Sequence, residues 1–308
     1  MKVLVTGGAG FIGSNLCQLL VDDDRFDEVR IIDDFSTGFK DNLDGIPVSL
    51  TEASILDQDA LTEAAEGVDA VVHLAALGSV PRSIADPERS HNVNATGTLK
   101  VLLAARDNNA HVIAASSSSV YGANKRLPKV EDMLCMPMSP YAVSKLATEQ
   151  YAMACSQVYG MDVLPFRFFN VYGPRQRAGH VYAAVIPVFV DAALRGERLP
   201  IHGDGAQSRD FTFVGTVTDT IRQALVARVT SGPLNLAYGT RTPLLELVDL
   251  IRVQTGVDVS VTHLAPRAGD VSHSQADGSR LRRLFPTIDP VPLEEGLGET
   301  ISWMRTAL

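Results

Sequence analysis

The sequence predicts an α/β fold: a doubly wound parallel sheet with helices on both faces, followed by a smaller C-terminal mixed α/β region. Two observations support this prediction. In the first half of the chain, short apolar runs without polar alternation are separated by stretches with helical spacing. Buried parallel strands joined by crossover helices produce that rhythm. After about residue 170 the rhythm ends, and glycine, proline, arginine and aspartate become frequent.

The chain is therefore expected to form two regions. Residues 1–169 would form the sheet domain, and residues 170–308 would mainly form the second region, with late strands returning to the sheet from about 211–240. The expected strands are brief, apolar and rich in β-branched residues: 2–6, 29–33, 68–74, 111–115 and 162–169. The expected helices carry apolar residues at helical spacing: 11–21, 57–66, 92–106, 141–159, 184–194 and 244–255.

Composition excludes several classes of protein. The chain has 308 residues, a formal net charge of −9 and 45% hydrophobic residues, enough for a large buried core. Its three cysteines show no C-x-x-C spacing, so neither a disulfide framework nor a structural metal site is expected. The sequence has no clustered Lys/Arg stripe and no apolar run near the roughly 20 residues of a membrane span. We expect a cytoplasmic protein without a metal, a nucleic-acid partner or a membrane partner.

A glycine-rich turn follows the first strand and opens the first helix. Its spacing, Gly7-x-x-Gly10-x-x-Gly13, is a variant of the dinucleotide-binding fingerprint. Glycine allows the tight turn and lets backbone N–H groups reach a pyrophosphate at the positive end of the helix. Asp33 ends the second strand, where a carboxylate accepts hydrogen bonds from an adenosine ribose and repels a 2′-phosphate. The pattern favours NAD as cofactor and a Rossmann-type sheet; the alternative is an ordinary tight turn.

A second constellation combines a Tyr-x-x-x-Lys pair with a run of serines. Tyr141 and Lys145 share one face of an expected helix, because residues four apart are neighbours there. A phenol of pKa about 10 needs about 4 kcal/mol of stabilisation to ionise near neutrality, and a nearby cation favours the phenolate. Residues 116–119 are all serine and follow an expected strand, where a hydroxyl could relay a proton to Tyr141. The alternatives are a solvated surface pair and a turn whose serines satisfy backbone groups.

With these elements on one chain, the sequence resembles the extended short-chain dehydrogenase/reductase superfamily. Within it, the sequence is most similar to the NAD-dependent nucleotide-sugar epimerases of the UDP-glucose and UDP-N-acetylglucosamine 4-epimerase group. The matching blocks extend over nearly the whole chain: TGGAGFIGSN (6–15), HLAALGSVPRS (73–83), SSSSVYG (116–122), SPYAVSK (139–145), RFFNVYGPRQ (167–176), GDGAQSRDFTFV (203–214) and RAGDVSHSQAD (267–277).

The resemblance implies roles for individual residues. Tyr141 would be the catalytic base, Lys145 would hold the nicotinamide ribose, and Ser117 would be the hydroxyl partner, with Ser119 as the second choice. The residues that would bind NAD, besides Tyr141 and Lys145, are Gly7, Gly10, Phe11, Ile12, Gly13, Asp33, Phe35, Ser36, Thr37, Gly38, Ser54, Ile55, Leu74, Ala75, Ala76 and Asn94. Those that would contact the substrate are Ser79, Arg82, Ser117, Ser119, Tyr141, Asn170, Arg209, Arg267, Asp270 and Ser274.

Four of these substrate residues would hold the nucleotide. The resemblance implies that Asn170 donates to the diphosphate and that Arg209 and Arg267 clamp phosphate oxygens, for which guanidinium forks are well suited. Asp270 would accept a hydroxyl of the nucleotide ribose. Either arginine could instead form a surface salt bridge.

Two positions depart from the pattern of the group. The usual Asp-Ile pair of the adenine pocket is Ser54-Ile55 here, which would weaken adenine recognition without changing the chemistry. Ser274 stands where enzymes restricted to unsubstituted hexoses have tyrosine, so a 2-acetamido group would fit. The alternative for Ser274 is a neutral loop serine.

The activity implied is epimerisation at C4 of a UDP-hexose, interconverting UDP-glucose with UDP-galactose and the N-acetylated forms with each other. Tyr141 would take the C4 hydroxyl proton while hydride passes to tightly bound NAD, giving a 4-keto sugar that is reduced again from the opposite face. The alternatives are a UDP-glucuronate epimerase or decarboxylase, another nucleotide-sugar enzyme of the superfamily, and a non-catalytic NAD-sensing protein. A dehydratase is disfavoured because Ser118 and Ser119 replace the acidic pair of that class.

Two expected helices, 92–106 and 141–159, carry several small apolar residues. Such faces allow close helix packing, and the resemblance implies that these helices pair across a homodimer. The alternative is packing within one subunit.

Overall fold

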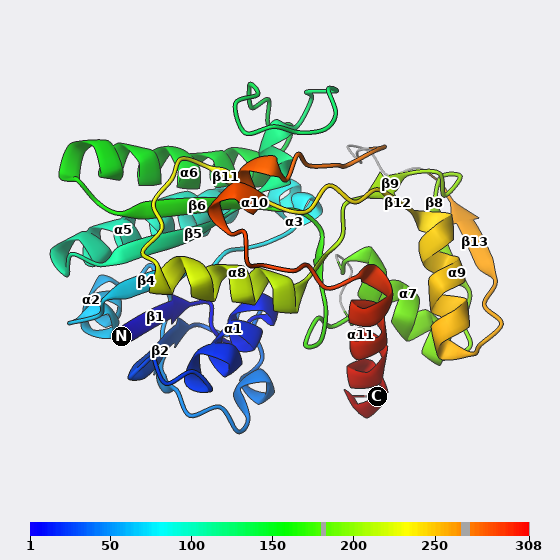
Figure 1. Cartoon of the computed structure of the whole chain (residues 1–308), viewed down its shortest axis with the longest axis horizontal. Helices are drawn as coiled ribbons and strands as arrows, with labels where there is room; N and C mark the ends of the chain where they lie inside the picture. The colour runs from blue at the N-terminus through cyan, green and yellow to red at the C-terminus, as the bar shows by residue number, and fades with distance from the viewer. Residues whose placement is uncertain (180–182, 266–271, 308) are drawn as a thin grey trace. The chain divides into compact units, whose positions relative to one another are not determined.

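The computed structural model describes residues 1–179, 183–265 and 272–307 (Figure 1). The chain separates into two compact units. Unit 1 comprises Met1–Asn124, Glu131–Phe168 and Thr218–Asn235, and unit 2 comprises Lys125–Val130, Phe169–Val217 and Leu236–Leu308. The segment that returns to unit 1 contains most of one helix and a short strand, where the sequence analysis expected strands.

Unit 1 is built on a seven-stranded sheet, and the predicted fold class is confirmed. The pairings β1–β2, β1–β4, β2–β3, β4–β5 and β5–β6 are parallel. Val5 of β1 lies between Ile31 of β2 and Val72 of β4, so the order β11-β6-β5-β4-β1-β2-β3 reverses direction at β1. Open α/β sheets bind ligands at such a reversal, beyond the carboxyl ends of the strands. The strands are β1 (Lys2–Thr6), β2 (Glu28–Asp33), β3 (Ser49–Glu52), β4 (Ala70–His73), β5 (His111–Ser117), β6 (Val163–Phe168) and β11 (Leu234–Leu236).

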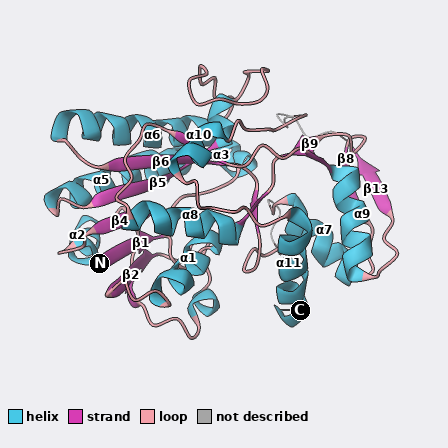
Figure 2. Cartoon of the chain, in the orientation of Figure 1, coloured by secondary structure: helices cyan, strands magenta, loops and turns pink. Residues whose placement is uncertain are grey.

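Helices cover both faces of this sheet (Figures 1 and 2). On one face, α2, α5 and α6 pack over an apolar core that includes Leu61 of α2, Leu102 of α5 and Ala152 of α6. On the other face, α1 and α8 lie side by side, and Arg222 of α8 forms an ion pair with Asp23 after α1 at 3.1 Å. These helices are α1 (Phe11–Val21), α2 (Gln58–Ala65), α5 (Gly97–Asp107), α6 (Pro140–Tyr159) and α8 (Val214–Val226).

The expected helix over 92–106 begins irregularly. Asn92–Thr96 forms a π-helical turn, and the regular helix α5 starts only at Gly97. Gly97 packs directly against the side chain of Ile55, where a Cβ atom would have no room. Such π turns occur often at functional sites. The remaining short elements of unit 1 are η1 (Lys40–Leu43), α3 (Val80–Ala85), α4 (Pro87–His91) and η3 (Ser118–Tyr121).

Unit 2 has its own small sheets and aromatic core. Among its described residues, β7 pairs with β10 and β8 with β13 in parallel, and β9 pairs with β12 antiparallel. The ring of Tyr172 lies edge-on to Phe211, with centroids 6.2 Å apart, and 5.6 Å from Phe213. The elements are β7 (Val171–Tyr172), α7 (Val185–Leu194), β8 (Leu199–His202), β9 (Ser208–Arg209), β10 (Thr212–Phe213), β12 (Thr242–Pro243), α9 (Leu244–Thr255), β13 (Val261–Leu264), α10 (Ser279–Leu284) and α11 (Leu293–Ala307).

Three further observations concern the described part of the chain. None of its helices is both long enough and apolar enough to cross a membrane. All three cysteines are free thiols. No group of three or more His, Cys, Asp or Glu residues within 1–179, 183–265 and 272–307 is placed to hold a metal ion.

Candidate active site

Close backbone contacts shape the glycine-rich turn after β1. Gly7 has a φ of +72°, and a Cβ atom on it would lie 2.7 Å from the backbone N of Ala75. A Cβ atom on Gly13 would collide with the carbonyl oxygen of Gly7. Gly10 is the residue before α1, and because glycine has no side chain, no side-chain hydrogen bond caps the start of the helix. The turn therefore presents backbone N–H groups, rather than side chains, at the positive end of α1, which favours an anionic ligand there.

The carboxylate of Asp33 is held at the end of β2. Its Oδ2 atom accepts a hydrogen bond from the N–H of Ala9 at 2.9 Å, and its Oδ1 atom accepts one from the N–H of Phe35 at 2.8 Å. Burial raises the pKa of this carboxyl group, and the two backbone donors oppose the rise. A carboxylate oxygen can accept more than one hydrogen bond, so Asp33 is fixed in place and still able to accept ribose hydroxyl groups.

A pocket of about 80 Å³ in unit 1 lies beyond the carboxyl ends of β1, β2 and β4. The predicted cofactor residues that line it are Gly7, Gly10, Asp33, Ser36, Thr37, Ser54, Ile55, Leu74, Ala75 and Ala76. The lining residues that sequence reasoning did not assign are Ile32, Asp34, Ala53 and Val93, each a direct neighbour of an assigned residue. The backbone N–H groups, the close approach at Gly7 and the acceptor at Asp33 together fit a dinucleotide such as NAD.

Other predicted cofactor residues border this pocket without lining it. Phe11, Ile12 and Gly13 form the first turn of α1. Gly38 packs closely against the glycine-rich turn, and Phe35 has a φ of +53° directly after Asp33 and Asp34. Their contact with a cofactor stays a prediction.

Asn94 has a role in the scaffold. It is buried in the π-helical turn, where its Oδ1 atom accepts from the N–H of Leu77 at 2.8 Å. Its Nδ2 atom donates to the carbonyl of Leu77 at 3.2 Å and to the hydroxyl of Ser144 at 3.0 Å. The amide thus holds the loop after β4 against α6, while the neighbouring Val93 lines the pocket. Direct contact of Asn94 with a cofactor stays a prediction.

The start of α6 is fixed by its own sequence. The Ser139 side chain accepts a hydrogen bond from the N–H of Ala142 at 3.1 Å, and Pro140 occupies the first helical position. Tyr141 and Lys145 therefore lie one turn apart at the beginning of this helix.

The structure brings Tyr141, Lys145 and Ser117 together at the end of β5. The Ser117 hydroxyl lies near the Tyr141 phenol, and hydrogen bonding from it lowers the pKa of that phenol. Lys145 is buried, and its Nζ atom donates to the carbonyl of Ala115 at 2.9 Å. A phenol, a hydroxyl and an ammonium group at one strand end can move a proton to or from a bound alcohol.

Burial governs the protonation of these groups. It raises the pKa of Tyr141 above its usual value of 10, and the hydrogen bond with Ser117 acts in the opposite direction. Burial lowers the pKa of Lys145 to about 8, so the ammonium form still predominates at pH 7. The chain by itself thus holds Tyr141 as a neutral phenol. A further positive charge bound beside it would favour the phenolate.

Three of the four serines after Ala115 have distinct environments. The Ser116 hydroxyl donates to the buried carboxylate of Glu149. Ser117 accepts from the N–H of Ser119 at 3.1 Å, so the residue that contacts Tyr141 also forms the local turn. The hydroxyl of Ser119 is buried without a hydrogen-bond partner among the described residues.

Ser79 and Arg82 lie at the start of α3. Ser79 has a φ of +107°, and its hydroxyl accepts from the N–H of Arg82 at 3.3 Å. This hydroxyl therefore caps the helix. The predicted contact of these two residues with a sugar stays a prediction.

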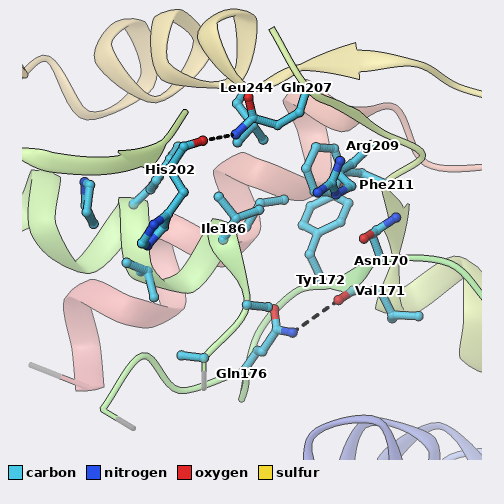
Figure 3. Close-up of a pocket in the computed structure, with 16 residues that line it drawn as sticks. Asn170, Val171, Tyr172, Gln176, Ile186, His202, Gln207, Arg209, Phe211 and Leu244 are labelled. Carbon is cyan, nitrogen blue, oxygen red and sulfur yellow. Dashed lines mark hydrogen bonds between the residues drawn. The ribbon is translucent and has the colours of Figure 1, made fainter. Parts of the chain in front are cut away.

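Unit 2 contains a second pocket, of about 240 Å³, lined by Asn170 and Arg209 (Figure 3). The Nδ2 atom of Asn170 donates to the carbonyl of Asp210 at 3.1 Å, and Nη1 of Arg209 donates to the carbonyl of Ser208 at 3.0 Å. An apolar slot with a guanidinium group fits a flat ring that carries an anionic substituent. The apolar and aromatic lining consists of Val171, Tyr172, Ala183, Ala184, Val185, Ile186, Val188, Phe189, Pro200, Phe211 and Leu244.

Three polar residues of this pocket were missed by sequence reasoning. Nε2 of Gln176 donates to the carbonyl of Val171 at 3.1 Å, and Nε2 of Gln207 donates to the carbonyl of His202 at 2.6 Å (Figure 3). The Oε1 atom of Gln176 is buried and has no hydrogen-bond partner among the described residues. Nδ1 of His202 lies 2.9 Å from the carbonyl of Ala265, which can only accept, so Nδ1 carries a proton. Gln176 and Gln207 had a sequence signal, because they lie in the matching blocks 167–176 and 203–214, whereas His202 had none.

The remaining predicted substrate residues lie in the segment 267–274. Arg267 and Asp270 are outside the described residues. The N–H of Ser274 donates to the carbonyl of Ser208 at 3.0 Å, which places Ser274 beside the strand that carries Arg209.

The comparisons with known proteins agree with this geometry. The sequence model of the family described as "NAD dependent epimerase/dehydratase family" matches residues 3–237. A UDP-glucose 4-epimerase from Mycolicibacterium smegmatis is 36% identical over 99% of both chains.

Solved structures are similar over the full length. A UDP-N-acetylglucosamine 4-epimerase from Methanobrevibacter ruminantium, in complex with UDP-N-acetylmuramic acid, has a TM-score of 0.94 and 38% identity, covering 100% of this chain and 99% of that one. A UDP-glucuronic acid 4-epimerase from Bacillus cereus, in complex with UDP-glucuronic acid and NAD, has a TM-score of 0.92 and 29% identity over 100% of both chains.

Proposed function

The chain belongs to the NAD dependent epimerase/dehydratase family, whose cofactor is NAD, and from that membership we propose that it is a UDP-hexose 4-epimerase. The proposed reaction interconverts UDP-glucose with UDP-galactose and UDP-GlcNAc with UDP-GalNAc. The observation that carries this proposal is the placement of Tyr141 and Lys145 on one face of α6 at the end of β5, where the buried Lys145 ammonium group donates to the carbonyl of Ala115 and the Ser117 hydroxyl lowers the pKa of Tyr141.

Different residues of unit 1 would bind the cofactor and transfer the proton. The backbone N–H groups at the start of α1 would hold the pyrophosphate, Gly7 and Gly10 would let it approach the turn closely, and Asp33 would accept the adenosine ribose hydroxyls. When bound, NAD supplies a hydride acceptor and donor, so the epimerisation involves no net oxidation. Tyr141 would remove the proton of the C4 hydroxyl and later return it, with Ser117 as the hydrogen-bonded relay. Lys145 would hold the nicotinamide ribose.

The residues of unit 2 would bind the nucleotide part of the substrate. The guanidinium group of Arg209 and the amide of Asn170 suit a diphosphate, and the apolar pocket suits a pyrimidine ring. We extend this proposal to Arg267 as a second phosphate ligand and to Asp270 as a ribose ligand. The small side chain of Ser274 would admit a 2-acetamido group.

We also propose a homodimer. Several side chains of α6 are apolar and exposed: Val143 (52%), Tyr151 (39%) and Val158 (70%). Their spacing of eight and seven residues places them on one face of the helix, which a second copy would cover.

The proposal is tested by incubating the purified protein, without added NAD, with UDP-galactose, UDP-GalNAc or UDP-glucuronate and following the products by NMR. We expect conversion of the two uncharged hexoses, because no added cofactor is needed when NAD stays bound. Conversion of UDP-glucuronate alone would instead assign a uronate epimerase or decarboxylase. Inactivity toward all three would contradict the proposal.

The Tyr141→Phe variant tests the assigned base. Removing the phenol oxygen should lower kcat by about 100-fold to 10,000-fold while bound NAD is retained, because general acid–base catalysis contributes that much. NMR turnover and the NAD content of the purified protein are the measurements. Tyr159→Phe is the matched control, since Tyr159 is an exposed tyrosine of the same helix and should leave turnover unchanged.

A further inference from the structure

One face of α6 is attached to the end of β5 at three successive turns. Tyr141, Lys145 and Glu149 are spaced by four residues and therefore share that face. Their partners are consecutive residues of β5: Ser117 for Tyr141, Ala115 for Lys145 and Ser116 for Glu149. The contact between Glu149 and Ser116 therefore fixes the same register of α6 against β5 that brings Tyr141 near Ser117.

Glu149 is part of a deeply buried ion pair. Its side chain is 0% exposed and that of Arg167 on β6 is 4% exposed. Nε and Nη2 of Arg167 donate to the two carboxylate oxygens at 2.9 and 2.8 Å. Taking both charges out of water is costly, and apolar side chains of similar volume often serve stability equally well. The pair therefore points to a role in geometry rather than in stability.

Arg167 also holds the turn that follows Ser117. Its Nη1 atom donates to the hydroxyl of Tyr121 at 2.9 Å, and its guanidinium carbon lies 4.8 Å from the centre of the Tyr121 ring. Tyr121 closes the turn η3 and donates in addition to Oδ1 of Asn235 at 2.6 Å. Ser117 is therefore held on both sides, by Ser116 through the carboxylate and by Tyr121 through the guanidinium group.

We propose that Glu149 and Arg167 are positioning residues for the reaction. Their ion pair fixes both the register of α6 and the turn after β5, and so keeps the Ser117 hydroxyl beside the Tyr141 phenol. The inference rests on the proposed function, because that function makes Tyr141 the base. Neither residue touches the substrate.

The test replaces the pair with apolar side chains of similar size, Glu149→Leu with Arg167→Met. We expect this double variant to fold with an unfolding midpoint within about 5 °C of the parent protein, because no unpaired charge is left behind. We expect kcat to fall at least about 30-fold with KM changed by less than about threefold, since only the proton-transfer geometry is disturbed.

The pH dependence distinguishes positioning from simple structural support. Losing the Ser117 hydrogen bond should raise the pKa of Tyr141 further, so the rise of kcat with pH should move to higher pH. Titratable or charged groups on the elements packed around Tyr141 include Lys145 and Glu149 on α6, Arg82 on α3, Tyr121 on η3, Arg167 on β6 and the neutral His73 on β4. The Ser117→Ala variant should give the same shift, and adding it to the double variant should have no further effect.

A second measurement needs no substrate. The absorbance difference between each protein and its Tyr141→Phe form reports ionisation of Tyr141 directly, and the double variant should titrate at higher pH. This readout separates failure of the inference from failure of the proposed function, which would appear as an inactive parent protein. If the double variant does not fold, the Arg167→Lys variant replaces it. This variant keeps the positive charge but loses the pair of hydrogen bonds from the guanidinium group to Glu149. We expect the Tyr141 titration of this variant to move to higher pH as well.

The matched control is the exposed ion pair of Arg228 and Asp162, whose side chains are 44% and 42% exposed. Arg228→Gln with Asp162→Asn should change neither kcat nor the pH profile. The inference would be overturned by a variant that keeps both the kcat and the Tyr141 titration of the parent protein. This holds for the double variant at Glu149 and Arg167 and for the Arg167→Lys variant.

Discussion

Two tyrosines of unit 1 show how surroundings decide the role of a residue. Tyr121 is buried with its pKa raised to about 12, and its hydroxyl donates to Asn235 while accepting from Arg167. Tyr141 has Ser117 as its partner and lies at the start of a helix beside a buried ammonium group. The first hydroxyl is committed to the scaffold, whereas the second retains hydrogen-bonding capacity for a substrate.

Ser54 gives a prediction about cofactor affinity. It lines the pocket of unit 1, and its hydroxyl accepts from the N–H of Leu56 at 3.3 Å. Ser54→Asp would add a charged acceptor for the adenine amino group and should tighten NAD binding about tenfold, since hydrogen bonds to charged groups contribute about 1.5–3 kcal/mol. Calorimetric titration with NAD of protein stripped of cofactor measures this. Ser54→Ala is the control, and unchanged affinity of the aspartate variant would show that adenine is recognised elsewhere.

Gln176 gives a prediction with two opposite effects. Its Oε1 atom is buried and lacks a partner among the described residues, which costs stability unless a ligand donates to it. Gln176→Met should therefore raise the melting temperature of the ligand-free protein and raise KM for the nucleotide sugar about tenfold, with a smaller effect on kcat. Thermal unfolding and turnover measure the two effects. The exposed Gln58→Met should change neither, and an unchanged KM would show that the substrate does not reach Gln176.

At the scale of elements, the helices α1 and α6 begin in different ways, and the difference matches their proposed tasks. α6 is capped by Ser139 and starts with Pro140, so its first N–H groups are satisfied by the chain itself. α1 starts after Gly10 without a side-chain cap and without an acidic residue in its first turn. The open start of α1 suits an anionic ligand, and the closed start of α6 suits the precise placement of Tyr141.

The close packing of α1 against its turn gives a prediction. Gly13→Ala would place a Cβ atom against the carbonyl oxygen of Gly7 and 2.8 Å from Cα of Gly8. Backbone atoms must then move, so we expect a loss of about 1–3 kcal/mol of unfolding free energy and a strong loss of bound NAD. Urea unfolding and the NAD content of the purified protein are the measurements. Gly232→Ala is the matched control, because its Cβ atom would meet open space; equal behaviour of both variants would contradict the packing argument.

At the scale of the whole molecule, each unit contains a buried titratable group, and the two respond oppositely to acid. In unit 1, His73 bonds to Thr6 at 2.8 Å and to Thr98 at 2.9 Å, and burial lowers its pKa to about 3. In unit 2, Asp210 accepts from the N–H of Ala276 at 2.9 Å, and burial raises its pKa to about 6. The folded state therefore disfavours charge on both groups.

These shifts predict how stability changes with pH. The unfolded pKa of histidine is about 6.5, so the contribution of His73 to stability is lost as pH falls below that value. The unfolded pKa of aspartate is about 4, so the contribution of Asp210 is present below pH 4 and is lost as pH rises through about 6. Between pH 7 and pH 5 each effect amounts to about 1–2 kcal/mol, with opposite sign.

Two variants separate the contributions. His73→Asn should lose less unfolding free energy than the parent protein when pH falls from 7 to 5, because it has no imidazole to charge. Asp210→Asn should lose more, because it lacks the carboxyl group that gains a proton. Urea unfolding at both pH values measures the difference, and a change of equal sign in both variants would contradict the assignment.

Much of the site could be predicted because its signals are local. The glycine spacing, the acid at the end of β2 and the pair spaced by four residues on α6 are each contained in a short segment. The bounds of α1 and α9 agree with the sequence analysis, since both helices have clear periodicity and end signals. The helices α8 and α11 were missed by the sequence analysis. The pocket residues Gln176 and His202 were also missed, because the pocket is formed by segments that are far apart in the sequence.

The sequence by itself determined the parallel sheet and the glycine-rich turn, and it predicted Tyr141 as the base, because backbone geometry and helical spacing act over a few residues. The tertiary structure places Ser117, the first choice of the sequence analysis, near Tyr141, and it alone decided where the buried charges pair. Ser117 and Tyr141 are far apart along the chain, as are Glu149 and Arg167, and only the packing of α6 on β5 and β6 brings them together. Burial, which sets the protonation of Tyr141 and Lys145, likewise exists only after that packing has excluded water.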